Sequence, residues 1–351
     1  MGEHRTTRPP EFSVVSGAAV HRSLEGRRAE VLDLVEDAYR LHGAGHTVNP
    51  PSYFLRFPDR PASRIIALPA SVGGDVGVDG IKWISSFPTN VELGIPRASA
   101  MLVLNDRVTG YPFACLEGSI ISAVRTAASA AVAARHLTAK RGAPRRIGFI
   151  GTGLIARYIH TYLGELGWPV EEFGVFDLNE EYARSFAGQV LGADTGTPVT
   201  VHSTAEELIR SSDLVVLATT AAAPHITDPD WFSHHPVVLH VSLRDLSTAI
   251  VLDSVNVVDD VDHVLQADTS VHLTEQQTGG RDFLHATLND VLTGEYTVPA
   301  DRTVVFSPFG LGLLDLVVGS NVHRWARAAG EVTTVDGFFH DLDRHQSAGT
   351  R

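Results

Sequence analysis

The chain has very little cysteine, and Cys115 is the single one among 351 residues. One cysteine cannot form an internal disulfide or a metal-type cysteine cluster, so we expect Cys115 to be a buried structural residue rather than a catalytic thiol. Positive charge is also scarce: 28 Lys and Arg stand against 41 Asp and Glu, a formal net charge of −13. This balance argues against nucleic acid or an anionic membrane surface as a partner.

Long apolar runs are missing too. No stretch approaches about eighteen consecutive apolar residues, so no transmembrane helix is predicted. Residues Met1–Gly17 are polar and contain proline, without the apolar segment of a signal peptide. We therefore expect a protein of the reducing cytoplasm.

A chain of this length is longer than one compact core usually spans, so two domains are predicted. Residues 1–130 together with 313–345 are expected to form an α+β domain, and residues 131–312 a nucleotide-binding domain. The predicted elements of the first domain are a tail over Met1–Pro10, helices over 25–43 and 119–137, and β-like runs at 64–68, 80–84 and 100–105.

The second domain alternates apolar runs with helical periodicity. Several runs show little alternation, which suits strands buried on both faces of a parallel sheet. The pattern therefore predicts an α/β fold with a Rossmann-type doubly wound parallel sheet. The predicted strands are 146–150, 172–176, 199–202, 214–219, 237–241 and 255–258, with helices at 154–166, 179–191 and 205–211, and residues 303–328 begin as a strand and become helical after Gly310 and Gly312.

A glycine turn follows the first of these strands. Gly151-Thr152-Gly153-Leu154-Ile155-Ala156 has the form G-x-G-x-x-A, which places a diphosphate on the N-terminus of the following helix. The next strand ends at Asp177, where a carboxylate receives the adenosine ribose hydroxyls and repels a 2′-phosphate. These features predict NAD as the cofactor. The alternative is that Asp177 only caps a helix.

Other cofactor contacts are expected beyond the carboxyl ends of the strands, where ligands of open α/β sheets bind. Ordinary loop polarity is the alternative for these positions. The expected cofactor-binding residues outside the turn are Leu178, Thr219, Thr220, Ser242 and Leu243.

Isolated basic residues stand in apolar surroundings in the first domain and in the alanine-rich helix. Arg56, Lys82 and Arg125 could form a clamp for substrate carboxylates, or three ordinary ion pairs. The acidic cluster Asp259, Asp260 and Asp262 could bind a cation, but we expect a solvated turn and no metal site. The four tryptophans, Trp83 among them, are expected to pack in cores or interfaces.

The motifs carrying these residues resemble the ornithine cyclodeaminase/mu-crystallin family. They are Gly80-Ile81-Lys82-Trp83, Asn105-Asp106 with Gly110-Tyr111-Pro112, Arg125-Thr126-Ala127-Ala128, the glycine turn, and Phe306-Ser307-Pro308-Phe309-Gly310-Leu311-Gly312 with Asp315. Within the family, Arg64-Ile65-Ile66-Ala67-Leu68-Pro69 and the Gly-Ile-Lys-Trp segment are most similar to the branch that forms 2,3-diaminopropionate from N-(2-amino-2-carboxyethyl)-L-glutamate for siderophore assembly.

The resemblance implies residue roles. Lys82 and Asp245 would be catalytic, with Asp245 as general base. Arg56, Lys82, Arg97 and Arg125 would bind substrate carboxylates, and Arg125 and Thr126 would also lie near the cofactor. A homodimer formed through the first domain is implied as well.

The implied reaction is NAD-dependent oxidation of the conjugate, followed by hydrolysis to 2-oxoglutarate and L-2,3-diaminopropionate for a siderophore or a peptide natural product. Ser242-Leu243-Arg244-Asp245 stands where the cyclodeaminases have a glycine-rich segment, which argues against ornithine cyclisation. Alanine dehydrogenase, ketimine reductase and ornithine cyclodeaminase remain alternatives. A non-catalytic, nucleotide-binding protein like mu-crystallin is another.

Overall fold

The computed structural model describes residues 10–192 and 196–340, and these form two compact units. The first contains the described residues up to Gly26, Thr47–Ile121 and the residues from Asp315 onward. The second contains Arg27–His46 and Ser122–Leu314. The predicted tail Met1–Pro10 lies outside the described residues except for Pro10.

The first unit is built on an eight-stranded sheet with the order β16-β1-β7-β6-β5-β4-β2, and β3 also pairs with β4. All neighbours in this sheet are antiparallel except β1 and β7. Its elements are β1 (Ser13–Val15), α1 (Gly17–Leu24), β2 (Thr47–Val48), β3 (Tyr53–Phe57), β4 (Arg60–Val72), β5 (Val78–Ser86), η1 (Pro88–Leu93), β6 (Ala98–Asp106), β7 (Pro112–Glu117) and β16 (Thr333–Thr334).

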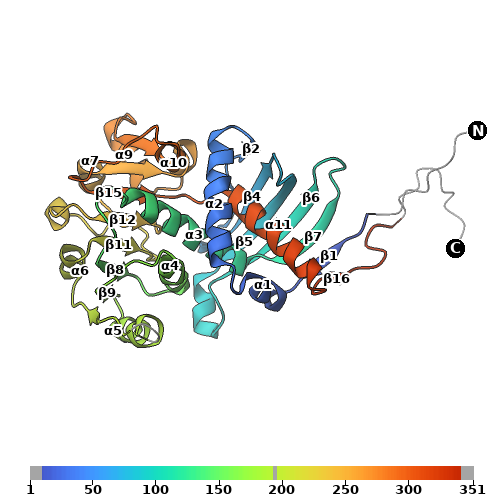
Figure 1. Cartoon of the computed structure of the whole chain (residues 1–351), viewed down its shortest axis with the longest axis horizontal. Helices are drawn as coiled ribbons and strands as arrows, with labels where there is room; N and C mark the ends of the chain where they lie inside the picture. The colour runs from blue at the N-terminus through green and yellow to red at the C-terminus, as the bar shows by residue number, and fades with distance from the viewer. Residues whose placement is uncertain (1–9, 193–195, 341–351) are drawn as a thin grey trace, which may run out of the picture. The chain divides into compact units, whose positions relative to one another are not determined.

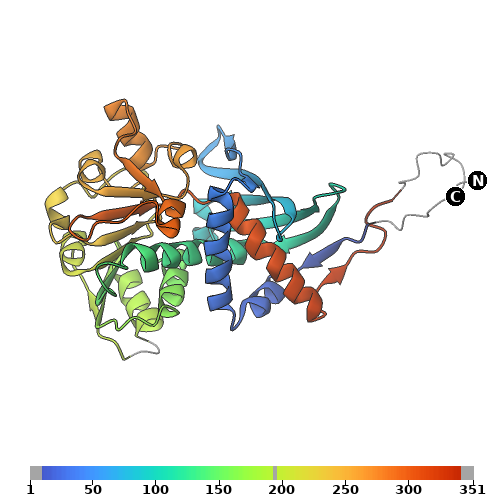
Figure 2. The same ribbon diagram turned by 45° about the horizontal axis from the view of Figure 1, so that its top comes forward.

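One face of this sheet is covered by α11 (Gly312–Ala328), which Figure 2 shows lying across the strands. Contact is close because glycines remove side chains from both surfaces: a Cβ on Gly319 would lie 2.1 Å from Leu102 Cδ2, and one on Gly80 would lie 2.8 Å from Leu316 Cδ2. Leu102 and Leu104 point to this face and are fully buried. Met101 lies on the opposite face and is 52% exposed.

The second unit holds an all-parallel sheet with the order β10-β9-β8-β11-β12-β15-β13-β14 (Figure 1). Its strands are β8 (Arg146–Ile150), β9 (Glu172–Phe176), β10 (Val199–Val201), β11 (Leu214–Leu217), β12 (Val237–His240), β13 (Val255–Val258), β14 (Leu284–Thr287) and β15 (Val304–Ser307). Strands β11, β12, β13 and β15 are buried at every position, as expected for strands covered on both faces.

Helices lie on both faces of this sheet. Phe149 of β8 contacts Phe186 and His160 on one face, whereas Ile150 joins a core with Leu208 and Ile250 on the other. The helices of the unit are α2 (Arg28–Gly43), α3 (Ser119–Leu137, from Ser122 on), α4 (Leu154–Gly164), α5 (Glu180–Phe186), η2 (Ala187–Leu191), α6 (Ala205–Ser211), η3 (Pro229–Phe232), α7 (Thr248–Asp253), α8 (Val261–Val264), α9 (Ser270–Thr278) and α10 (Leu288–Thr293).

The α/β class and the doubly wound parallel sheet are confirmed, but several elements differ from the prediction. The predicted helix 25–43 corresponds to α2, which begins at Arg28, because Gly26 at φ +70° lies in the turn before it. Helix α1, on the other side of this turn, was not predicted. The predicted strand 64–68 extends through Pro69, which pairs with Ile81 as part of β4. The domain boundary differs as well: α2 and residues 122–130 were predicted in the first domain but belong to the second compact unit. Within that unit Tyr39 and Ser129 share a hydrogen bond of 2.7 Å. The role of the first domain in substrate binding and dimerisation stays a prediction.

Across the described ranges, every helix is too short or too polar to cross a membrane.

Gly148 tests the packing of the parallel sheet, because a Cβ there would lie 2.4 Å from both Leu208 Cδ2 and Ser212 Oγ of neighbouring α6. We expect Gly148→Ala to destabilise the protein by about 1–3 kcal/mol through overpacking. Thermal unfolding followed by circular dichroism measures this as a lower midpoint. Gly164→Ala is the matched control, since nothing lies within 4 Å of that Cβ. Equal midpoints for the two variants would contradict the packing described.

Candidate functional site

The glycine turn between β8 and α4 has the geometry of a diphosphate site. Gly151 has φ +87°, and a Cβ there would lie 2.6 Å from the carbonyl oxygen of Ala218, so the position requires glycine. A Cβ on Gly153 would meet nothing within 4 Å, which leaves open space in front of the helix. Gly153 is the N-cap of α4, and no described side chain caps it. The backbone N–H groups of the first turn are therefore available to an anion.

Asp177 ties the end of β9 to this turn. Its Oδ2 accepts hydrogen bonds from the Thr152 backbone N at 3.0 Å and from Thr152 Oγ1 at 2.8 Å. The N-cap of α5 is Asn179, whose side chain accepts from the backbone N of Glu181. The alternative that Asp177 only caps a helix is therefore wrong. A carboxylate at this place favours NAD over NADP.

A buried carboxylate, Asp245, lies beyond the carboxyl ends of β11 and β12. It is fully buried, and its Oδ1 accepts from Thr219 Oγ1 and lies 3.0 Å from His225 Nε2. Its Oδ2 accepts from Ser242 Oγ and lies 3.3 Å from His240 Nε2. We call these five residues the Asp245 centre. Thr219 and Ser242, expected at the cofactor, thus have hydroxyl groups that bind Asp245, while Thr220 is exposed and Leu243 is buried.

The Asp245 centre stabilises the ionised carboxylate. Burial alone would raise the pKa of Asp245, but the contacts from His225, His240 and Ser242 outweigh it and hold the pKa well below its usual range. A carboxylate with a lowered pKa is a weak base, because its ionised form is already satisfied by hydrogen bonds. The expected role of Asp245 as general base stays a prediction, and the structure adds His225 and His240 to the groups that could move protons.

The backbone holds the Asp245 centre together. The backbone N–H groups of His225 and Ile226 both donate to the Asp245 carbonyl oxygen, at 3.0 and 2.9 Å. Ile226 and Leu246 form an isolated parallel bridge. Leu243, two residues before Asp245, has φ +70°, which is strained for a branched side chain. Strain of this kind is retained where the surrounding contacts fix the backbone.

Arg125 lies elsewhere in the second unit, against the turn that follows β15. A Cβ on Gly310 (φ +95°) would lie 2.7 Å from Arg125 Nη1, so glycine makes room for the guanidinium. Asp259 fixes this turn by accepting from the backbone N of Phe309 at 2.9 Å and of Gly310 at 2.7 Å. Asp259 is 2% exposed, so the prediction of a solvated acidic turn is wrong at this position. The neighbouring Thr126 hydroxyl donates to the Ser122 carbonyl oxygen.

Lys82 lies in the first unit on the face of β5 that α11 covers. Its Nζ is 2.6 Å from Asp315 Oδ2, and both side chains are buried, at 2% and 0% exposure. A buried lysine needs such a partner. The sequence motif that contains Lys82 and the closing motif that contains Asp315 are thus joined directly.

Basic side chains also gather at one end of this sheet. Arg56 of β3 pairs in register with Arg64 of β4, and Arg64 pairs with Ser86 of β5. Arg97 Nη1 donates to Ser86 Oγ at 2.7 Å. Residues opposite each other in a sheet share a face, and like charges placed so repel unless an anion or a partner offsets them. We call Arg56, Arg64 and Arg97 the arginine row; the sequence predicted a role for Arg56 and Arg97 but not for Arg64.

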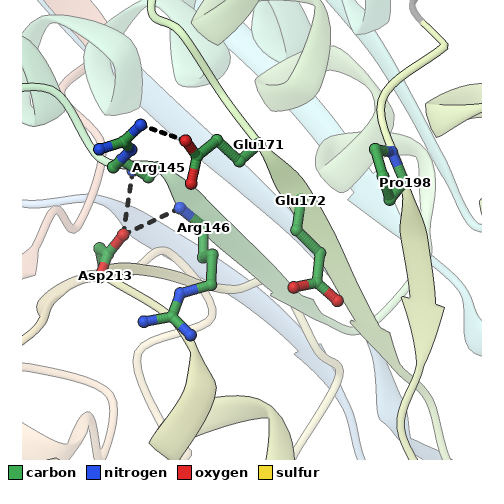
Figure 3. A pocket seen from close by; sticks show the side chains of 6 residues that line it. All are labelled: Arg145, Arg146, Glu171, Glu172, Pro198 and Asp213. Carbon is green, nitrogen blue, oxygen red and sulfur yellow. Dashed lines mark hydrogen bonds and ion pairs between the residues drawn. The ribbon is translucent and has the colours of Figure 1, made fainter.

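A hollow of about 550 Å³ in the second unit lies at the opposite edge of its sheet from the glycine turn. Figure 3 shows it beside the first residues of β8 and β9, where Asp213 accepts from the backbone N of Arg145 and Arg146, and Arg145 pairs with Glu171. Ligands of parallel sheets bind at the carboxyl ends of strands, and these polar groups already bind one another. This hollow therefore has no part in the candidate site.

A model of the ornithine cyclodeaminase/mu-crystallin family matches residues 15–330. The chain belongs to this family. The resemblance found in the motifs is thereby confirmed. Since the match covers both sheets, the family model accounts for the two units and not only for the glycine turn.

Three relatives are informative. The nodulation efficiency protein NfeD of Rhizobium meliloti is 31% identical over 88% of this chain and 93% of its own length. The N-((2S)-2-amino-2-carboxyethyl)-L-glutamate dehydrogenase of Staphylococcus aureus is 28% identical over 89% and 94%. An archaeal alanine dehydrogenase dimer with bound NAD is 25% identical, with a TM-score of 0.83 over 93% of this chain and all of that one.

Asp177 tests the cofactor assignment. We expect Asp177→Ser to weaken NAD binding about 10- to 100-fold, because the ribose hydroxyls lose a charged acceptor, and to reduce the preference for NAD over NADP. Calorimetric titration with both dinucleotides measures this. Thr152→Val is the control: it removes the hydroxyl that Asp177 binds but keeps the carboxylate, so the NAD preference should persist. An Asp177→Ser variant with unchanged preference would refute the assignment.

Proposed function

We propose that this protein is an NAD-dependent dehydrogenase that converts N-(2-amino-2-carboxyethyl)-L-glutamate to 2-oxoglutarate and L-2,3-diaminopropionate. It would act in the cytoplasm, as a homodimer, in the synthesis of a siderophore or peptide natural product. As a family member with a dinucleotide turn, the chain is an oxidoreductase that acts on the CH–NH bond of an amino-acid substrate. The choice of this particular substrate is the proposal.

The arginine row is the observation that supports this choice of substrate. The conjugate has three carboxylates, and guanidinium groups bind carboxylates in a bidentate manner. Arg56, Arg64 and Arg97 crowd positive charge at one end of a sheet in a protein with a formal net charge of −13. Lys82 lies on the same face of β5 as Ser86, four residues along the strand, and is held in place by Asp315.

The chemistry divides between cofactor and protein. A bound NAD⁺ would supply the oxidising chemistry, uptake of the hydride from the glutamate Cα, and the oxidised substrate would be an imine. Arg56, Lys82, Arg97 and Arg125 are the proposed carboxylate ligands, and Lys82 and Asp245 the proposed catalytic residues. The Asp245 centre would supply and remove the protons that imine hydrolysis needs. The first turn of α4 would bind the diphosphate, with Asp177 at the ribose.

Alanine oxidation is the second candidate, supported by the archaeal alanine dehydrogenase that is 25% identical to this chain. Alanine carries one carboxylate, so the arginine row would be more than it requires. An inactive nucleotide-binding protein is the third. It gives no reason for the strained backbone and the ordered carboxylate of the Asp245 centre.

Reduction of NAD⁺ discriminates among these candidates. We expect the conjugate to be oxidised with release of 2-oxoglutarate, and L-alanine and L-ornithine to react at least about 100-fold more slowly in kcat/KM, a difference of about 2.7 kcal/mol. Arg97→Gln should raise KM for the conjugate about tenfold or more, because a charged hydrogen bond to a carboxylate is lost. Arg107→Gln, which removes an exposed partner of Asp79, is the control. Faster oxidation of alanine would replace the proposed substrate.

The open face of the first sheet supports the proposed homodimer. Tyr53, Ala67, Trp83 and Met101 are register partners across four strands, on the face that α11 does not cover. Tyr53, Trp83 and Met101 are 67%, 44% and 52% exposed. Half-buried Cys115, expected in the core, lies on the same face beside Val103. An exposed apolar face of this kind is typical of an interface, and a two-fold dimer would use the same face on both copies of the chain.

We expect the wild-type protein to be a dimer by light scattering and the Trp83→Glu/Met101→Glu variant to be monomeric, since charge at an interface core must be desolvated. Val108→Glu is the control, because Val108 is 94% exposed in a turn outside this face. A wild-type monomer, or a dimer that survives both charges, would refute this interface.

A further inference from the structure

His225 is the one exposed member of the Asp245 centre, with 42% of its side chain accessible. Its Nε2 lies 3.0 Å from Asp245 Oδ1, and its backbone N donates to the Asp245 carbonyl oxygen at 3.0 Å. The residue is therefore fixed to Asp245 at two points. No hydrogen-bond partner is found for His225 Nδ1 within the described residues, and this nitrogen belongs to a side chain that is 42% exposed.

Asp245 and His225 differ in their ability to accept a proton from a substrate. Asp245 is fully buried and receives contacts on both oxygens, from Thr219 and His225 on Oδ1 and from Ser242 and His240 on Oδ2. A carboxylate so bound has no accessible lone pair for a substrate proton. His225 has the opposite arrangement: Nε2 lies against the carboxylate, and no partner for Nδ1 is found among the described residues. In a neutral ring this arrangement places the proton on Nε2 and a lone pair on Nδ1.

We propose that His225, held in orientation by Asp245, is the acid–base catalyst of imine hydrolysis. The inference rests on the proposed function for the identity of the imine. It changes the role of Asp245 from the general base to a positioning residue. His240 lies on the other side of the carboxylate, fully buried, with its Nδ1 3.2 Å from Ser307 Oγ, so it has no route to a substrate.

The proposed step balances as follows. His225 Nδ1 takes a proton from water as the water oxygen bonds to the imine carbon, and the C=N π electrons move to nitrogen to give a carbinolamine. The imidazolium returns this proton to the nitrogen, which gives the neutral carbinolamine. His225 Nδ1 then takes the carbinolamine hydroxyl proton and delivers it to the same nitrogen as the C–N bond breaks, so the ketone forms and the amine leaves neutral. The sum is imine plus water giving 2-oxoglutarate plus the amine. Asp245 offsets the positive charge of the ring between the two transfers.

Among the described residues, the titratable groups linked to His225 by a contact are Asp245 and, through its carboxylate, His240. The ring is bound to Asp245, which also contacts His240, and the other two members of the centre, Thr219 and Ser242, carry neutral hydroxyls. We therefore expect a single acidic limb in the pH dependence of kcat that belongs to the coupled His225–Asp245 pair.

Kinetics of His225→Gln test the inference. We expect kcat to fall about 10²- to 10⁴-fold, with the acidic limb lost and NAD affinity unchanged. Because only hydrolysis is impaired, the first turnover should still give a burst of NADH close to the enzyme concentration. His225→Asn, a second variant of similar polarity, should behave alike, and His272→Gln, on α9 and outside the Asp245 centre, is the control. Wild-type kcat and pH profile in both His225 variants would overturn the proposal.

A second readout does not depend on turnover. In ¹⁵N spectra of the histidine rings, His225 should show its proton on Nε2 in the wild type and lose this tautomer preference in Asp245→Asn. A proton on Nδ1, or no response to Asp245→Asn, would overturn the inference. If the wild type fails to oxidise the conjugate, the proposed function falls, and the ring spectra still decide whether Asp245 orients His225.

Discussion

The hydrogen bonds that converge on Asp245 are the constraint on which the candidate site depends. The residues that contact this carboxylate follow two parallel strands, β11 and β12, or end one of them, and they join the loops that leave those strands. The loops would otherwise diverge, since each continues into a different crossover. A buried charge costs several kcal/mol unless it is satisfied, so the contacts of the centre together stabilise the ionised carboxylate. The same bonds orient His225 and hold Leu243 in a strained conformation.

The parallel sheet brings the glycine turn and the Asp245 centre to the same edge of the second unit. All eight strands run in the same direction, so the carboxyl ends of β8, β9, β11 and β12 meet at one edge. Gly151 reaches the backbone of Ala218, just beyond β11, which is possible only without a side chain. The dinucleotide turn and the loop that leads to His225 are thus neighbours through backbone contact. A cofactor bound at the turn would extend along the edge that holds Asp245.

Sequence patterns predicted helices and strands best where a single local signal determines the element. The strands Arg146–Ile150 and Glu172–Phe176 and the helix Ser119–Leu137 agree with the prediction at both ends, because apolar runs and an alanine-rich stretch are local signals. The insertion of β15 between β12 and β13 could not be predicted, since strand order depends on contacts distant in sequence. His225 was missed for the same reason. It is an isolated histidine in a loop, and only its contact with Asp245, twenty residues later in the sequence, indicates a role.

Transfer of isotope from substrate to cofactor tests the central claim most directly, that the CH–NH bond of the glutamate moiety is the one oxidised. The conjugate labelled with deuterium at the glutamate Cα would be incubated with NAD⁺ and the wild-type protein. We predict that mass spectrometry finds the deuterium in NADH and that the labelled substrate reacts more slowly before the hydrolytic step. Deuterium retained in the organic product, or lost to water while NADH carries ordinary hydrogen, would contradict the account.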